Sequence, residues 1–351
     1  MKILIIGDWH SKIHEEALKN GFIKLGHQVV EFKWFSYFKA NNKLKLFLLK
    51  LQNKFLFGPV IRLIQKDIIH LAKLEQPDVI FIYRGTHIFA STLDKLKKTI
   101  KTKIIVYNND DPFSKKQPSY YWRHFIQSLK FCDLALAYRH HNMKDFTQNG
   151  AVKVGLLRSW FIPEKDFPVA KDLIEDQFIH DVVFIGHYEN DGRDKLFEYL
   201  LDNGIRLKIY GPEWNKHINQ FTKLQSLLPT HSLSGLDYNK VISGSKITIC
   251  ILSKLNRDTY TRRCFEIPAI KGFMLAEYTE DLASLFIEDS QVAFFRNKEE
   301  LLNKIKFFLK NETERQTIAE NGFKAVYAGK HDNTSRAQEV IEHIHGLKDV
   351  L

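Results

Sequence analysis

The chain has 351 residues and a mass of 41.2 kDa, which is too long for one compact core and indicates two domains. Hydrophobic residues at 44% and charged residues at 26% are typical of globular proteins and exclude disordered, collagen-like and multi-spanning membrane proteins. The net charge is +11, but residues 1–160 hold 27 basic and 12 acidic side chains, and the remainder carries a net −4. The basic excess therefore concerns what the first half binds.

The first half alternates short apolar runs with amphipathic segments. Residues 2–6 form a continuous apolar run that ends at Gly7, and a helical pattern follows over 11–25. This alternation is typical of βαβ units with a parallel sheet. Further buried strands are expected over 27–34, 77–83, 103–109, 132–138 and 151–157.

A second series of apolar runs begins after a charged, proline-containing segment at 158–177. Its strands are expected over 180–186, 204–211, 245–252 and 272–278, with helices from residue 298 onward. The sequence therefore predicts an α/β protein of two Rossmann-like domains, with parallel sheets facing each other across a cleft. We expect domains over residues 1–160 and 161–330, and a C-terminal helix over 331–351 that can pack back on the N-terminal domain.

Between Phe32 and His70 the pattern changes to a basic amphipathic helix. Such a helix either lies on an anionic membrane surface or packs on the sheet with solvated lysines, and the sequence leaves both open. Apolar side chains share one face and lysines gather elsewhere: Leu44, Leu48, Leu51 and Phe55, against Lys43, Lys50 and Lys54.

No apolar stretch reaches the roughly 18 residues of a membrane span, because lysines interrupt the most apolar region. The initial apolar run is too short for a signal sequence. Cys132, Cys250 and Cys264 stand far apart without a CxxC pair, which favours free thiols in a reducing compartment. We expect a cytoplasmic protein, with peripheral binding at the inner face of the membrane as an option.

Ligands of such folds bind at the carboxyl ends of the strands, so candidate residues must follow strands. The chain lacks a GxGxxG fingerprint and a Walker A lysine loop, which argues against dinucleotide-dependent dehydrogenases and P-loop NTPases. In the first half the titratable candidates at this rim are Asp8, His10, His87, Asp110 and Asp111.

One string near residue 270 carries a family resemblance. Residues 263–286, RCFEIPAIKGFMLAEYTEDLASLF, resemble the nucleotide-sugar segment of GT-B glycosyltransferases, in particular the CgeB-like family. Residues 77–88 and 103–112 are similar to strands of that family's N-terminal domain, 181–200 to the opening of its second domain, and 287–326 to its closing helices. The likeness covers nearly the whole chain and says nothing of the sugar.

The resemblance implies a donor site in the second domain. Glu266 is the position that accepts hydrogen bonds from the ribose hydroxyls, with a helix N-terminal glutamate as the alternative interpretation. Arg263, Arg257 and Arg193 would face the diphosphate, where fixed cations can replace a metal, or would be surface arginines. The remaining expected donor-site residues are Gly186, His187, Tyr210, Gly211, Ser234, Gly235 and Phe265.

The resemblance also implies a catalytic base in the first domain, since an acceptor hydroxyl needs a carboxylate or imidazole within reach. Asp110 or Asp111 is favoured, with His87 and Asp8 as further candidates. Asp111 before Pro112 can instead form a turn, and paired aspartates can hold a metal. His10 and His14 have metal-ligand spacing but no third ligand, so no metal site is expected.

The sequence thus predicts a metal-independent glycosyltransferase without a cofactor. It would transfer a sugar from a nucleotide-diphosphate sugar to an anionic glycan, a lipid-linked saccharide or an acceptor at a membrane surface, in surface polysaccharide or glycoconjugate synthesis. A non-catalytic sugar-nucleotide-binding protein is the alternative. A basic nucleic-acid-binding protein is less favoured, because no recognition motif accompanies the charge.

Overall fold

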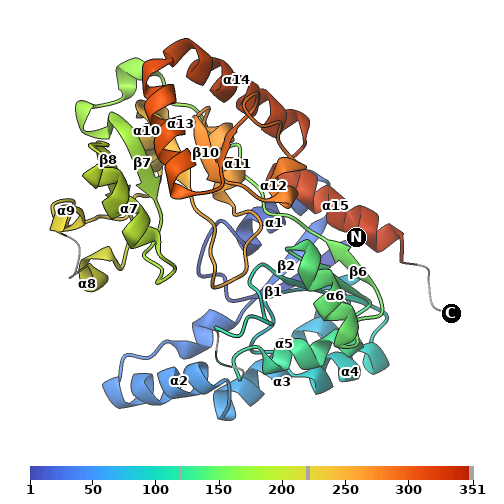
Figure 1. The fold of residues 1–351 in the computed structure, drawn as a ribbon. Coiled ribbons are helices and arrows are strands. Elements are labelled where there is room, and N and C mark those ends of the chain that lie inside the picture. Colours follow the sequence, from blue (N-terminus) through green and yellow to red (C-terminus); the bar gives the residue numbers. More distant parts are fainter. Residues whose placement is uncertain (117, 119, 219–221, 348–351) are drawn as a thin grey trace. The chain divides into compact units, whose positions relative to one another are not determined.

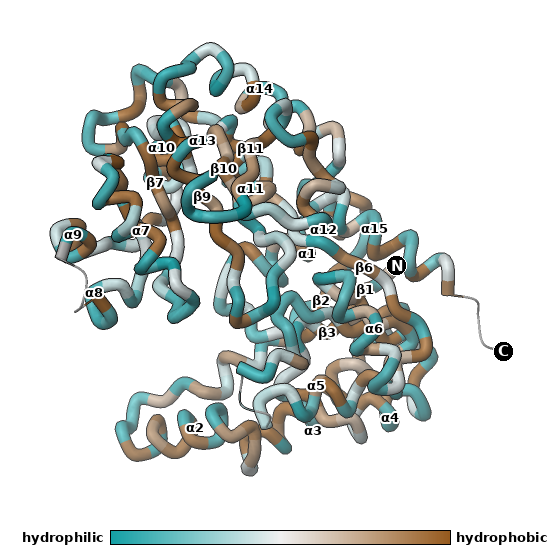
Figure 2. The backbone as a smooth tube through the Cα atoms, viewed as in Figure 1, coloured by the Kyte–Doolittle hydropathy of each residue, from teal (hydrophilic) through white to brown (hydrophobic). Residues whose placement is uncertain are grey.

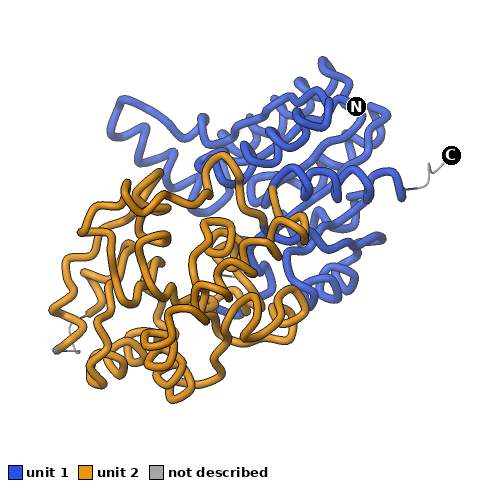
Figure 3. Tube along the Cα trace, turned by 90° about the horizontal axis from the view of Figure 1, so that it is seen from above, with its two compact units in different colours: residues 1–159, 333–351 blue, residues 160–332 orange. Residues whose placement is uncertain are grey.

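The computed structural model describes residues 1–116, 118, 120–218 and 222–347, and the chain forms two compact units (Figure 3). Unit 1 consists of Met1–Ser159 and Asn333–Leu351, and unit 2 of Trp160–Asp332. The sequence places the first boundary one residue later, and it begins the C-terminal helical segment two residues before the second boundary. Each unit is an α/β domain built on one parallel sheet.

Unit 1 has a six-stranded sheet in the order β2-β1-β3-β4-β5-β6, and every pair is parallel. Central strands read as continuous apolar runs because helices cover both faces. Leu4 and Ile80 belong to a core cluster on one face, and Phe81 meets Phe22 on the other. The strands are β1 (Lys2–Gly7), β2 (Gln28–Lys33), β3 (Val79–Tyr83), β4 (Lys103–Asn108), β5 (Leu134–Ala137) and β6 (Val154–Leu156).

The helices of unit 1 alternate with the strands in βαβ order, except that two long helices stand in one connection. α2 and α3 both lie between β2 and β3 (Figure 1). The helices are α1 (Glu15–Lys24), α2 (Lys43–Phe55), α3 (Pro59–Glu75), α4 (Ala90–Thr99), α5 (Arg123–Ser128), α6 (His140–Gln148) and α15 (Asn333–His345), with 3₁₀ turns η1 (Trp34–Phe38) and η2 (Leu129–Phe131).

Unit 2 has a five-stranded parallel sheet in the order β11-β10-β9-β7-β8. Apolar side chains of α7 and α13 pack on one face of it, among them Phe197 and Ile305. Its strands are β7 (His180–Ile185), β8 (Leu207–Tyr210), β9 (Ser245–Cys250), β10 (Met274–Glu277) and β11 (Ala293–Phe295), the last of which the sequence did not predict.

The helices of unit 2 range in length from four to 17 residues. They are α7 (Arg193–Asp202), α8 (Trp214–His217), α9 (Thr222–Gln225), α10 (Leu236–Gly244), α11 (Arg263–Ala269), α12 (Glu280–Ala283), α13 (Lys298–Lys310) and α14 (Glu312–Ala328), with 3₁₀ turns η3 (Lys171–Leu173) and η4 (Asp176–Phe178). Among the residues that the structure describes, none of the helices combines the length and the apolar character needed to span a bilayer.

The last helix, α15, packs against α1 in unit 1 (Figure 1). The Asn333 side-chain amide donates to the carbonyl of Ala17 at 2.9 Å, and Arg336 Nε donates to the carbonyl of Ser159 at 3.1 Å. The two helices approach closely at Gly21, where an added Cβ would lie 2.7 Å from the Asn333 carbonyl oxygen and 2.8 Å from the Ala337 Cβ. The absence of a side chain at Gly21 therefore sets the distance between α1 and α15.

We expect Gly21→Ala to loosen this packing. The added methyl group must displace α15, and overpacking of this kind costs about 1–3 kcal/mol, more than the roughly 1 kcal/mol that alanine gains in a helix interior. Thermal unfolding should occur at a lower temperature, and amide hydrogen exchange in α15 should accelerate. Asn20→Ala, at an exposed position of the same helix, is the control and should change neither. Unchanged exchange in α15 would contradict the packing described.

Candidate functional site

The carboxyl edge of the unit 1 sheet gathers charged side chains around Arg84. Arg84 follows β3 in a left-handed backbone conformation, with a φ of 64°. Its Nη2 lies 2.7 Å from Asp110 Oδ2, after β4, and its Nη1 lies 4.0 Å from Asp8 Oδ2, after β1. Burial opposes the charge of the guanidinium, but Asp110 and Asp8 outweigh burial and raise the pKa of Arg84. The structure therefore assembles Asp8 and Asp110 around one permanent cation.

Asp8 also pairs with His10. Asp8 Oδ1 accepts from the backbone amide of His10 at 2.9 Å and contacts its ring Nδ1. Burial alone would raise the pKa of Asp8, but these hydrogen bonds lower it, and the bond to Asp8 in turn raises the pKa of His10 above 6.5. The His10 side chain is 45% exposed. An imidazole oriented by a carboxylate in this way is the arrangement of a general base.

A buried carboxyl group lies beneath this pair. Glu15, the first residue of α1, is 1% exposed, and its Oε1 accepts from the backbone amides of Asp8 at 3.0 Å and Trp9 at 3.4 Å. Burial and the Asp8 carboxylate raise the pKa of Glu15 to about 7. Glu15 therefore fixes the turn that carries Asp8 and His10, and near neutral pH it holds a proton in a large fraction of molecules.

Asp111 and His87 are buried and hydrogen-bonded within the protein, whereas a catalytic base must be accessible to the acceptor. Asp111 is fully buried, and its Oδ1 accepts from the Asn142 amide at 2.9 Å and the backbone amide of Phe113 at 3.0 Å, which is the turn-forming alternative. His87 is 6% exposed and its Nε2 lies 2.7 Å from Asn53 Oδ1. Burial lowers the pKa of His87 to about 3, so the imidazole is neutral. Its Nε2 is already engaged by Asn53.

In unit 2, the loops after β7 and β8 meet at two glycines. A Cβ on Gly211, whose φ is 138°, would lie 2.1 Å from the Gly186 carbonyl oxygen, so only glycine fits there. The Trp214 indole donates to that same carbonyl at 2.8 Å, and the Thr230 hydroxyl donates to the Gly211 carbonyl at 2.8 Å. These contacts hold backbone groups close together at the carboxyl edge of the sheet.

Arg263, the first residue of α11, lies beside this loop. Its Nη2 is 3.6 Å from the Cβ position of Gly186, and its side chain is half-buried. Among the residues that the structure describes, none forms a hydrogen bond or ion pair with the Arg263 guanidinium, although its charge is one of those that lower the pKa of Glu266. A guanidinium held at a loop without a direct ion pair is suited to bind an anion from solution.

Arg193, by contrast, is committed to its own loop. Its side chain is 3% exposed, and it donates to Asp191 Oδ1 at 2.8 Å and Oδ2 at 2.7 Å and to the His187 carbonyl at 2.8 Å. The structure therefore assigns Arg193 to the shaping of residues 187–191 in place of the expected phosphate contact. Phe265 is also corrected, since its ring is fully buried against Tyr260 and cannot line a donor site.

Glu266 lies in a buried cluster of charged groups. Its Oε1 accepts from Arg262 Nε at 2.6 Å, its Oε2 accepts from the Tyr238 hydroxyl at 3.1 Å, and Arg262 Nη2 also bonds Asp166 at 3.0 Å. Burial would raise the pKa of Glu266, but Arg262 outweighs it and lowers the pKa, while burial and Glu266 raise the pKa of Asp166 to about 6. Two of the lone pairs of Glu266 are thus already used within the protein.

The remaining expected donor residues lie around the same edge of unit 2. The His187 ring is 53% exposed and pairs with Glu189 at 2.9 Å, whereas Tyr210 is buried and its hydroxyl bonds His180 at 2.9 Å. Ser234 and Gly235 are exposed at the start of α10. A cavity of 240 Å³ is lined by Leu252, Ser253, Lys254, Arg257, Asp258, Glu277, Tyr278 and Thr279.

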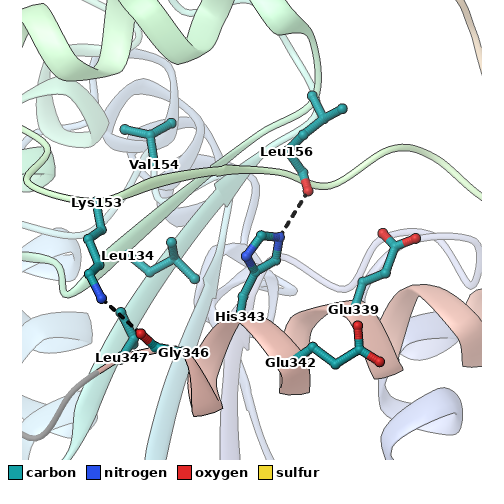
Figure 4. A pocket seen from close by; sticks show the side chains of 9 residues that line it. All are labelled: Leu134, Lys153, Val154, Leu156, Glu339, Glu342, His343, Gly346 and Leu347. Atoms are coloured by element: carbon teal, nitrogen blue, oxygen red, sulfur yellow. Dashed lines mark hydrogen bonds between the residues drawn. The ribbon is translucent and has the colours of Figure 1, made fainter.

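Unit 1 has a further cavity of 560 Å³ between the edge strand β6 and α15 (Figure 4). His343 Nε2 lies 3.3 Å from the Leu156 carbonyl, and Lys153 Nζ donates to the Gly346 carbonyl at 3.0 Å. None of the residues that line it belongs to the charged rim around Arg84. We therefore interpret this cavity as a feature of the packing of α15 on the sheet edge.

Known proteins resemble this chain in part of its sequence and in its fold. Residues 193–342 match the family model described as "Glycosyl transferase-like", and no curated protein matches the sequence. Three solved structures are similar: sucrose-phosphate synthase of Thermosynechococcus elongatus (TM-score 0.73, 11% identity, 99% of both chains), HepE of Anabaena in complex with UDP-glucose (0.69, 13%, 99% of this chain and 100% of that chain) and a glycosyltransferase of Rickettsia africae (0.69, 14%, 100% and 99%).

The fold is that of the GT-B glycosyltransferases. At 11–14% identity, the three structures establish the fold of the chain and not its substrates. The expected α/β fold with two parallel sheets is confirmed.

Three residues of these sites were given no site role from the sequence: Arg84, Glu15 and Arg262. Arg84 was recognised as following a buried strand, and Arg262 was considered mainly as a surface arginine. Glu15 and Arg262 owe their roles to partners that the sequence does not identify. Arg262, for example, bonds Asp166, which is 96 residues away along the chain.

Glu15 should make the stability of unit 1 depend on pH. Its pKa of about 7 in the folded state lies above 4.5, so the folded state binds more protons between these values and stability falls as pH rises through them. We expect Glu15 to account for a loss of about 3 kcal/mol between pH 5 and pH 8 in urea unfolding, so the total loss should be smaller by that amount in Glu15→Gln. Asp166 and His10, whose pKa values are also raised, keep their own contributions. Glu16→Gln, in the same helical turn, is the control and should keep the loss. An equal slope in Glu15→Gln would contradict the assigned pKa.

Proposed function

We propose that the protein is a glycosyltransferase that takes a sugar from a nucleotide-diphosphate sugar, with UDP as the nucleotide. The match of residues 193–342 to a glycosyltransferase-like family supports the reaction class. Structural neighbours described as complexes with UDP or UDP-glucose support the choice of nucleotide. The finer resemblance to the CgeB-like family, carried by residues 263–286, stays a prediction, as does a role in polysaccharide synthesis.

The observation that carries this proposal is the free guanidinium of Arg263 beside Gly186. When the bond between the sugar and the diphosphate breaks, negative charge develops on the leaving diphosphate, and a fixed cation stabilises that charge. Arg263 supplies two or more donors in a planar fork that matches phosphate oxygens. With Arg263 and the cavity-lining Arg257 in this role, the reaction needs no metal ion and no cofactor, which is part of the proposal.

The same edge offers groups for the rest of the donor. A carboxylate has about four lone-pair sites, so Glu266 retains acceptor capacity for ribose hydroxyls beside its bonds to Arg262 and Tyr238. In this proposal, the backbone of Gly211 and of Ser234–Gly235 would contact the base. His187 borders the loop at Gly186 and is exposed enough to contact a ligand.

Unit 1 would bind the acceptor and remove its proton. In the proposed step, the acceptor oxygen forms the new bond to the anomeric carbon, the bond to the diphosphate breaks, and the hydroxyl proton passes to His10, which Asp8 orients. Arg84 holds Asp8 and Asp110 in place through its two guanidinium contacts. Asp110 stays the alternative base, since its carboxylate belongs to the same group.

The first test concerns Arg263. Arg263→Gln should weaken UDP binding, measured by isothermal titration calorimetry, by about tenfold to a hundredfold, because a charge-assisted hydrogen bond of about 1.5–3 kcal/mol is lost. Arg206→Gln is the matched control, since Arg206 is 83% exposed and pairs with Asp181 at the other end of the strands. Turnover of UDP-sugars should fall in parallel and should survive EDTA.

An unchanged UDP affinity in Arg263→Gln would contradict the donor site. Binding of UDP-sugars by the wild-type protein without transfer to any acceptor would instead favour the non-catalytic alternative.

The second test concerns the pair of Asp8 and His10. A general base acts in its neutral form, so kcat/KM should rise with pH through a value above 6.5, the ordinary pKa of histidine. Asp8→Asn removes the charge that raises the pKa of His10. The rise of kcat/KM with pH should therefore occur at lower pH, while kcat falls. His10→Gln should lower kcat by about a hundredfold or more.

Asp94→Asn is the control, because Asp94 pairs with Lys98 on the exposed face of α4. A pH profile that is identical in wild type and Asp8→Asn would exclude His10 as the base and would favour Asp110.

A further inference from the structure

The helix α2 presents its apolar face to solvent. Leu44 is 68% exposed, Phe47 57%, Leu48 50%, Leu51 37% and Phe55 49%, and at the helical repeat these five side chains fall within a stripe about 100° wide. Figure 2 shows hydrophobic and hydrophilic residues interspersed along α2. Helices of soluble domains normally turn such a stripe toward the core, so this face is suited to contact something other than water.

The rest of the helix surface is basic. Lys43, Lys45, Lys50 and Lys54 are all exposed, and α2 contains no aspartate or glutamate. At the same repeat, Lys43, Lys50 and Lys54 border one side of the apolar stripe and Lys45 lies on the other side. Long lysine side chains in these places can reach outward while the apolar side chains point into an adjoining layer.

The helix is held firmly in this orientation. Asn42 caps its start by accepting from the Lys45 amide at 3.0 Å, and Leu49 on the opposite side is buried. Asn53 Oδ1 bonds His87 at 2.7 Å, and Arg123 Nη2 donates to the carbonyls of Phe55 and Leu56 at 2.9 Å each. The exposure of the apolar stripe is therefore built into the fold of unit 1.

We propose that α2 binds unit 1 to the surface of a bilayer that contains anionic phospholipids. The apolar stripe would enter the boundary between headgroups and acyl chains, and the lysines would meet the phosphate groups. Charge favours this occupant over a second copy of the chain, because two α2 helices face to face would bring lysines together without a carboxylate on either helix. The length of α2, only 13 residues, is too short for a transmembrane segment.

The position of α2 links the membrane to the charged rim of unit 1. Asn53 in α2 contacts His87, which lies three residues after Arg84 in the loop that follows β3. A membrane-bound α2 would therefore place the group around Arg84 close to the lipid surface. If the proposed glycosyltransferase activity holds, this favours an acceptor carried by a lipid; the binding of α2 to the bilayer does not depend on that activity.

Vesicle co-sedimentation of the full chain, without any nucleotide, tests the proposal. We expect binding to vesicles of phosphatidylcholine with phosphatidylglycerol, little binding to pure phosphatidylcholine, and weaker binding as salt increases. Lys50→Gln with Lys54→Gln should weaken binding about 25-fold, at roughly fivefold for each lysine. Phe47→Glu with Leu48→Glu should weaken it at least about tenfold.

Two controls match these changes away from α2. Leu74→Glu alters an equally exposed apolar residue near the far end of α3, and Lys101→Gln removes an exposed lysine. Both should bind within about twofold of wild type, and circular dichroism should show that every variant is folded.

Three outcomes would overturn the proposal. The first is no binding to anionic vesicles at low salt, and the second is equal binding by wild type and the α2 variants. The third is a wild-type dimer that dissociates in Phe47→Glu with Leu48→Glu while vesicles remain unbound, which would make a second copy the occupant. Because no sugar nucleotide enters this assay, its failure leaves the proposed transferase activity untouched.

Discussion

The parallel arrangement of both sheets is the constraint on which every site in this protein depends. All strands of a sheet point the same way, so the loops that carry Asp8, Arg84 and Asp110 must meet at one edge of unit 1. The same constraint brings the glycines that follow β7 and β8 together in unit 2, where the Gly186 carbonyl leaves no space for a side chain at residue 211. Helices cover the faces of each sheet, so these loops are the places where polar groups can meet a ligand.

What distinguishes the arginines at these edges is whether a carboxylate already pairs with them. Arg193 forms an ion pair with Asp191, Arg262 with Glu266 and Asp166, and Arg84 with Asp110. Buried guanidinium groups need such partners, because an unpaired charge in the interior is costly. Arg263 is half-buried and has no such partner among the residues that the structure describes, so an external anion can stabilise it. This difference is why the proposed donor site centres on Arg263 and why Arg193 has a different task.

The sequence predicted the strands well, because buried parallel strands are continuous apolar runs: the run at 77–83 contains β3, and the run at 245–252 contains β9. It missed β11, which has only three residues. It also placed candidate residues after strands, at the carboxyl edges of the sheets, but could not rank them. Asp111 and His87 follow strands like Asp8 does, yet Asn142 and Asn53 engage them from segments distant in the chain. Which candidate is available for catalysis depends on such partners, and a single sequence does not show which residues pair in the fold. The amphipathic pattern of α2 was visible, but only the structure shows that its apolar face is exposed.

A crystal structure of the protein with UDP tests the central claim most directly. The quantity to measure is the distance between the guanidinium nitrogens of Arg263 and the oxygens of the β-phosphate. We predict a hydrogen-bonding distance of about 2.7–2.9 Å, with the phosphates beside the Gly186 loop. A diphosphate bound elsewhere, with Arg263 still without a contact to it, would contradict the proposed donor site.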